Sequence, residues 1–436
     1  MPISNQSASQ IELASKPRLR QPLAVDEAQY LDGSGVRQTQ ALRVLIIGFV
    51  IVMVDGYDSM MISFLAPLLA RDLALSPTDL GKIFAVGYLG AIVGAIAVGS
   101  LADRIGRKPM LIASLALASV ATMICADATS LATLTGLRFV AGMALGGALP
   151  ALISLTAEHT RPERRNGTIT LMYIGYPVGA VVGGAVTSGL LRYGSSAIFL
   201  GAGVTSLIAL ALALLLPESL RTGGHSTSAP RGRGTLLSSL REQFAERRLW
   251  PGLMLWVGLF SMLVVTYFLV SWTPTLLVKS GLSPGKAALG SVLLNLGGVI
   301  GALVMAPAVN RFGPYVPAAI AVGCGALVIA LLGQNFGSVP LLMIALFIAG
   351  GCIIGGQLNF PAMTVALYPQ HVRGAGTGWT MGVGRLGSIV GPMVGGALVA
   401  ANFSVGSLFV IAAIPPAIAA GALVIAAGMQ RTRQRL

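Results

Sequence analysis

Long apolar segments, separated by short polar stretches, recur along this chain. Each is about 20 residues long, the length that a helix needs to cross the hydrocarbon core of a bilayer. Barrel strands would alternate apolar and polar residues at every second position, and these segments do not. We therefore predict an all-α membrane protein with about twelve transmembrane helices, near residues 43–67, 80–102, 108–127, 131–157, 167–190, 195–216, 250–276, 286–308, 314–334, 338–362, 374–400 and 403–428.

The longest internal polar stretch separates the first six segments from the last six. We divide the chain into an N-terminal tail (1–42), a first half (43–216), a linker (217–249), a second half (250–428) and a C-terminal tail (429–436). Residues of the first half recur in the second at two near-equal offsets, which favours duplication over chance matching of Gly-rich helices. The recurring residues are Gly90, Gly94, Arg104 and Gly106 at an offset of 207, and Gly175, Gly179 and Gly183 at an offset of 212.

The number and placement of charged residues support a membrane protein and predict its orientation. Only 10% of the residues are charged, far below the ~25% that is usual in soluble proteins. The net charge of +14 does not indicate nucleic-acid binding, because the basic residues lie between apolar segments. Most of the 29 Lys and Arg fall in the tails and after even-numbered segments, which predicts cytoplasmic termini. The three cysteines have unrelated spacings and predict neither a disulfide framework nor a metal site, and we expect no cofactor.

The stretch GSLADRIGRKPML, residues 99 to 111, lies between the second and third segments. Its eight fixed positions resemble the G-x-L-A-D-R-x-G-R-K signature of the major facilitator superfamily, whose fold consists of two six-helix halves around a central site. Gly106 permits a tight turn. Asp103 can accept hydrogen bonds at the start of the eleventh helix and latch the halves, although a topology signal with an incidental Asp is the alternative. We expect Arg104 and Arg107 to face the cytoplasmic interface and, with Gly106, to belong to the same latch and gate.

Few carboxylates lie inside the apolar segments. Asp55 and Asp58 stand three residues apart in the first segment, on one helix face. Two such close carboxylates resist ionising together, so one tends to hold a proton, as a proton-coupled carrier requires. A structural pair satisfied by Arg138 is the alternative. Glu158, at the cytoplasmic end of the fourth segment, suits a gate salt bridge, because a helix C-terminus disfavours an unpaired carboxylate.

Two arginines lie inside apolar segments. Depth permits Arg138 to pair with Asp55 or Asp58, and we also count Arg138 among the predicted substrate-binding residues. Arg385 lies near mid-depth in a half that contains no Asp or Glu. Since a guanidinium cannot deprotonate in a protein, it needs an anion, carbonyl groups or water. We predict that a substrate carboxylate binds Arg385 through two hydrogen bonds. A cation held by backbone carbonyls is the alternative.

Polar residues at similar depth complete a predicted pocket, although each also suits ordinary helix packing. They are Tyr173, Tyr176, Tyr267, Asn295, Gln357 and Asn359.

Three further stretches narrow the family. DGYDSMMISFLAP (55–67), SWTPTLL (271–277) and RGAGTGWTMGVGRLGSIVGP (373–392) resemble the first, seventh and eleventh spans of the aromatic acid:proton symporters, which include 4-hydroxybenzoate and protocatechuate carriers. The resemblance implies that Asp55 and Asp58 couple transport to protons. It also implies that Arg385, Arg138 and Glu158 occupy functional charged positions.

We therefore predict proton-coupled symport of an organic anion, most simply an aromatic carboxylate, across the inner membrane. The expected partners are the organic acid, protons and the lipid bilayer, without nucleic acid. An aliphatic carboxylate such as muconate or a dicarboxylate, or a drug or sugar, is an alternative substrate. A membrane sensor would need a soluble domain, and an enzyme would need a catalytic or metal motif; we find neither.

Overall fold

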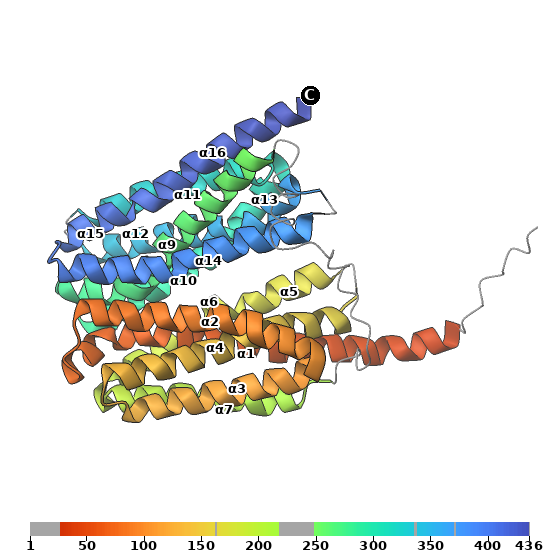
Figure 1. The fold of residues 1–436 in the computed structure, drawn as a ribbon, viewed down its shortest axis with the longest axis horizontal. Helices are drawn as coiled ribbons and strands as arrows, with labels where there is room; N and C mark the ends of the chain where they lie inside the picture. The colour runs from red at the N-terminus through yellow and green to blue at the C-terminus, as the bar shows by residue number, and fades with distance from the viewer. Residues whose placement is uncertain (1–26, 162–163, 218–247, 335–337, 370–371, 436) are drawn as a thin grey trace, which may run out of the picture.

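The computed structural model describes residues 27–161, 164–217, 248–334, 338–369 and 372–435. Over these residues the chain is helical, as Figure 1 shows. The first half comprises α1 (Glu27–Asp72), α2 (Pro77–Ile105), α3 (Arg107–Ile124), α4 (Leu131–His159), α5 (Arg165–Tyr173), α6 (Gly175–Leu190) and α7 (Ser195–Leu214). The second comprises α9 (Leu249–Lys279), α10 (Pro284–Phe312), α11 (Tyr315–Leu332), α12 (Val339–Gln357), α13 (Phe360–Leu367), α14 (Arg373–Ala400), α15 (Val405–Ala412) and α16 (Ile414–Arg435).

Twelve candidate spans, each apolar and long enough to cross a membrane, are present in this described part, one for each predicted segment. Three of them consist of two consecutive helices, α5 with α6, α12 with α13, and α15 with α16. Helix α1 also extends back to Glu27, into the segment that we expected to be a tail. The central linker lies almost wholly outside the described residues.

The predicted duplication is visible in helix pairing. Gly90 and Gly94 lie against the backbone of α4, and Gly297 and Gly301 lie in the same way against α12. The second glycine set repeats this with other helices, since α6 packs on α1 through Gly175, Gly179 and Gly183, and α14 packs on α9 through Gly387, Gly391 and Gly395. Close backbone approach at small residues is the usual way in which membrane helices associate.

The two halves lie side by side, and the C-terminus and the start of α1 project at the same end (Figure 1). We call the opposite end the distal end. The halves pack through α1 on α9, α2 on α14, and α6 on α10. One hydrophobic core crosses both halves and includes residues near the distal end, whereas a second core, around Val44, Leu115 and Leu152, belongs to the first half alone.

Candidate functional site

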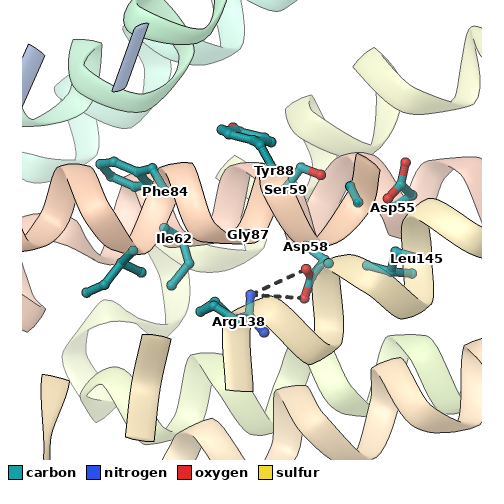
Figure 2. Close-up of a pocket in the computed structure, with 12 residues that line it drawn as sticks. Asp55, Asp58, Ser59, Ile62, Phe84, Gly87, Tyr88, Arg138 and Leu145 are labelled. Atoms are coloured by element: carbon teal, nitrogen blue, oxygen red, sulfur yellow. Dashed lines mark hydrogen bonds and ion pairs between the residues drawn. The ribbon is translucent and has the colours of Figure 1, made fainter. Parts of the chain in front are cut away.

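A small cavity lies beside the two carboxylates of α1. It has a volume of about 60 Å³ and is lined by residues of α1, α2 and α4, among them Asp55, Asp58 and Tyr88 (Figure 2). A water molecule needs roughly 10–15 Å³ of such space, so the cavity can hold a few waters next to the carboxylates. Both Asp55 and Asp58 are buried, with 8% and 6% of their surface exposed.

Asp58 belongs to a buried ion pair. Its carboxylate lies 3.3 Å from Nη1 of Arg138 on α4. Thr122 of α3 donates a hydrogen bond to Asp58 at 3.1 Å and accepts one from Arg138 at 2.9 Å. The guanidinium also lies over the ring of Phe199, 5.7 Å from its centroid. The predicted pairing of Arg138 with a carboxylate of α1 is therefore present, and Asp58 is the partner.

Asp55 has a different environment. Figure 2 shows Asp58 next to Arg138 and Asp55 farther from it. Among the residues that the structure describes, none donates a hydrogen bond to the Asp55 carboxylate, which interacts electrostatically with Asp58 and with Arg385 of the second half. The three-residue spacing on α1 thus gives one carboxylate a fixed cation and leaves the other facing the second half.

Arg385 lies on the face of α14 that is turned toward the first half. Pro392 and Gly396 follow it by seven and eleven residues, close to two and three helical turns, so the three share a face. Pro392 and Gly396 contact Gly81 of α2 near the distal end. Arg385 itself is exposed. Because its face points at the other half, this exposure places the guanidinium in the space between the halves.

The structure brings only some of the predicted pocket residues to Arg385. Tyr173 and Tyr267 lie within electrostatic range of both Arg385 and Asp55. Gln357 instead accepts a hydrogen bond from Thr266 at 2.7 Å, and buried Asn295 donates to the Ser291 carbonyl of its own helix at 2.9 Å. A role of Asn295, Gln357 or Arg138 in substrate binding stays a prediction.

Sequence reasoning missed Tyr88. Its ring lies edge-on against that of Tyr267, with centroids 4.4 Å apart, and so joins α2 to α9. One turn closer to the distal end, Phe84 of α2 meets Trp272 of α9 in the same edge-on manner. The signal was available, because Tyr88 precedes Asn295, a residue of the predicted pocket, by the 207 residues that relate the two halves.

The loop motif folds as a tight turn with a nearby ion pair. Gly106 joins α2 to α3 with a φ of 115°, and its repeat Gly313 has a φ of 78°, a backbone region that favours glycine. Arg107 forms a salt bridge with Glu158 and also donates to the Ser154 carbonyl. This pair ties α3 to α4 within one half. The side chains of Asp103 and Arg104 lie outside the described structure, so the latch stays a prediction.

Comparison with known proteins identifies the family. The sequence profile of the Major Facilitator Superfamily matches residues 48–334 and 280–434. The chain belongs to this superfamily. It is also 32% identical to a gallate transporter of Pseudomonas putida, over 96% of this chain and 98% of that one. It is 33% identical to the 3-(3-hydroxy-phenyl)propionate transporter of Escherichia coli strain K12, over 88% and 93%.

One more relative and two solved structures are also similar to this chain. The 4-hydroxybenzoate transporter PcaK of Acinetobacter baylyi is 31% identical, with 95% of this chain and 96% of that one covered. Among solved structures, the nucleoside transporter NupG has a TM-score of 0.71 at 15% identity, covering 89% of this chain and 98% of that one. A bacterial homologue of the human lysosomal transporter Spinster has a TM-score of 0.70 at 18% identity, covering 91% and 97%.

These findings confirm the predicted two-half, twelve-helix fold and the resemblance to the aromatic acid carriers. The protein is a multi-pass membrane transporter for a small molecule, as predicted, and not an enzyme.

Proposed function

We propose that this transporter takes up aromatic carboxylates together with protons across the inner membrane of the cell, with both termini in the cytoplasm. The relatives that carry aromatic acids, by their names, cover almost the whole chain. The excess of Lys and Arg in the tails and in the loops after even-numbered spans supports this orientation. The distal end then faces outward, and the halves are closed there in this conformation.

One observation carries the proposal. Exposed Arg385 faces the first half and interacts electrostatically with Asp55, which has no hydrogen-bond donor among the described residues. When Asp55 is ionised, it attracts Arg385 and competes with any substrate carboxylate. A proton from outside removes that charge, and Arg385 then binds the carboxylate through two hydrogen bonds. Release of the proton to the cytoplasm restores the attraction and expels the substrate.

Asp58 has a supporting role in this scheme. Its charge is neutralised by Arg138, so it does not compete for Arg385. Its negative charge close to Asp55 makes a second ionised carboxylate costly, which favours the protonated form of Asp55 when the site is loaded. The proton is the coupling ion, and the scheme involves no cofactor.

An experiment with purified protein in liposomes tests this proposal. With acid outside and neutral buffer inside, labelled 4-hydroxybenzoate should accumulate against its gradient, and a protonophore should abolish accumulation. The amide of the substrate should compete poorly, because it offers no charge-assisted hydrogen bonds. Arg385→Lys should bind weakly, and Arg385→Ala should not bind, whereas exposed Arg192→Ala is the control.

Two results would reject the proposal. Equal competition by the acid and by the amide would show that Arg385 does not bind the substrate carboxylate. Accumulation that does not respond to the proton gradient would show that transport is not coupled to protons. Preferential transport of muconate or another aliphatic dicarboxylate would leave the anion site intact and replace the substrate class.

A further inference from the structure

We propose that Tyr88, Tyr176 and Tyr267 form a slot that holds the aromatic ring of the substrate and selects aromatic acids over saturated ones of the same size. This inference rests on the proposed function, because it assumes that a carboxylate binds at Arg385. It adds the second recognition element that an anion site lacks, since a guanidinium alone does not distinguish one carboxylate from another.

The three tyrosines come from different helices and from both halves. Tyr88 lies on α2, Tyr176 on α6 and Tyr267 on α9. Tyr88 and Tyr267 meet edge-on, with an interplanar angle of 71°. Tyr176 packs against a small cluster that includes Val270 of α9, and it lies within electrostatic range of both other phenols and of Asp55. All three side chains are only partly buried, so their rings retain surface for a further contact.

The cluster occupies a definite level between the halves. Moving inward from the distal end, the contacts between α2 and the second half include Gly81 with Pro392, then Phe84 with Trp272, and then Tyr88 with Tyr267. Gly81, Phe84 and Tyr88 are three and four residues apart and therefore lie on one face of α2. Tyr88 also lines the cavity that contains Asp55 (Figure 2). The tyrosine pair thus closes the distal side of the space around Asp55 and Arg385.

Tyr267 connects the ring slot to the anion site. It packs against Tyr88 and lies within electrostatic range of Arg385 and Asp55. Among the described residues, its hydroxyl group has no hydrogen-bond partner. In this proposal, a carboxylate at Arg385 lies on the side of the site where Tyr267 packs against Tyr88. The group attached to that carboxylate then extends toward Tyr88 and Tyr176.

The chemistry of this slot favours a planar aromatic group. Aromatic rings prefer edge-on or offset contact with other rings, because the positive ring edge meets the negative ring face. Such a contact is worth about 0.5–1.5 kcal/mol beyond the burial of area, which corresponds to roughly twofold to tenfold in affinity. A cyclohexyl ring has similar bulk and no such quadrupole. Three tyrosines in one cluster should therefore produce a clear preference for the aromatic acid.

Competition between benzoate and cyclohexanecarboxylate isolates the ring, because both acids have the same carboxylate and the same carbon count. Affinities are measured by displacement of labelled 4-hydroxybenzoate from purified protein. We expect the wild type to prefer benzoate by about tenfold. Tyr88→Leu should reduce this ratio to about threefold or less, Tyr267→Leu should reduce it similarly, and Tyr88→Phe, which keeps the ring, should preserve it.

Two controls separate the slot from general damage. Tyr193→Leu removes a tyrosine that is 61% exposed and lies in the short helical turn after α6, and should leave the ratio unchanged. Arg385→Lys should weaken both acids by the same factor, because it changes only the carboxylate contact.

Each outcome has a separate meaning. A wild type that binds neither acid would reject the proposed function itself. A wild type that binds both acids equally, or a ratio that survives both Tyr88→Leu and Tyr267→Leu, would reject the slot and leave the anion site standing.

Discussion

At the scale of single residues, two identical side chains of α1 have different surroundings. Asp55 and Asp58 are three residues apart on α1, so they point about 60° apart around the helix. That difference turns Asp58 toward Arg138 and Thr122 and leaves Asp55 without a hydrogen-bond donor among the described residues. The sequence predicted a functional carboxylate pair and a pairing with Arg138. It could not say which Asp is paired, because that depends on how α1 is rotated against α4.

The first prediction concerns Asp55. We expect Asp55→Asn to abolish accumulation driven by a proton gradient while exchange of internal for external substrate continues, because Asn keeps the shape and cannot carry the proton. Uphill uptake and counterflow are measured in the same liposomes. Unchanged uphill uptake by Asp55→Asn would show that another group carries the proton.

The second prediction concerns the buried pair. Removing one partner leaves an uncompensated buried charge, which typically costs about 3–5 kcal/mol. We therefore expect Asp58→Asn to lower the unfolding temperature of the purified protein strongly, and the double variant Asp58→Asn with Arg138→Gln to recover part of the loss. Thermal unfolding in detergent measures both. If the double variant is less stable than Asp58→Asn alone, the pair is not the reason for the loss.

At the scale of helices, glycine positions were the most informative part of the sequence. The predicted repeat appears as equivalent helix pairs, α6 on α1 and α14 on α9. The breaks in three spans were not predicted. The residues between the two helices of each span lie two or three positions before Pro177, Pro361 and Pro415. A proline alone does not determine whether a span breaks, because α4 and α14 continue through Pro150 and Pro392. Whether a helix breaks depends on whether neighbouring helices satisfy the freed carbonyl.

The third prediction tests this helix packing. A Cβ at Gly179 would overlap the carbonyl oxygen of Met53 on α1. We expect Gly179→Ala to destabilise the protein by about 2 kcal/mol or more, because overpacking forces backbone movement. Gly391→Ala, at the equivalent position against α9, should behave in the same way. Gly136→Ala is the matched control, since no atom lies within 4 Å of its Cβ. Equal unfolding temperatures for Gly179→Ala and Gly136→Ala would contradict a close packing role.

At the scale of the whole molecule, the sequence predicted two halves and could not predict how they are tilted. A carrier adopts more than one arrangement of its halves with a single sequence, and these differ by only a few kcal/mol. In this structure the halves meet near the distal end through Gly81, Phe84 and Tyr88 of α2. The sequence therefore predicted only part of the pocket. It included Tyr267 and missed Tyr88, because the contact between these two residues crosses between the halves.

The fourth prediction concerns this closure. A Cβ at Gly396 would lie 2.7 Å from the Pro77 carbonyl oxygen and 3.3 Å from the Gly81 Cα, so a larger side chain cannot fit while α14 packs on α2. We expect Gly396→Leu to separate the distal ends, which stops transport because the carrier can no longer close at that end. The reporter is Thr187→Cys in a variant without the native cysteines. Thr187 is buried in a small pocket lined by both halves.

A membrane-impermeant maleimide, added outside intact cells, should label this reporter several times faster in Gly396→Leu than in the parent. Gly421→Leu is the control, because nothing lies within 4 Å of a Cβ at that position. Gly81→Leu, on the other side of the same contact, should reproduce the labelling. If both variants label as slowly as the parent and transport normally, the contact between α2 and α14 does not hold the distal end closed. Faster labelling together with loss of transport would show that this contact holds the distal end closed and that the carrier must close there in each cycle, as alternating access requires.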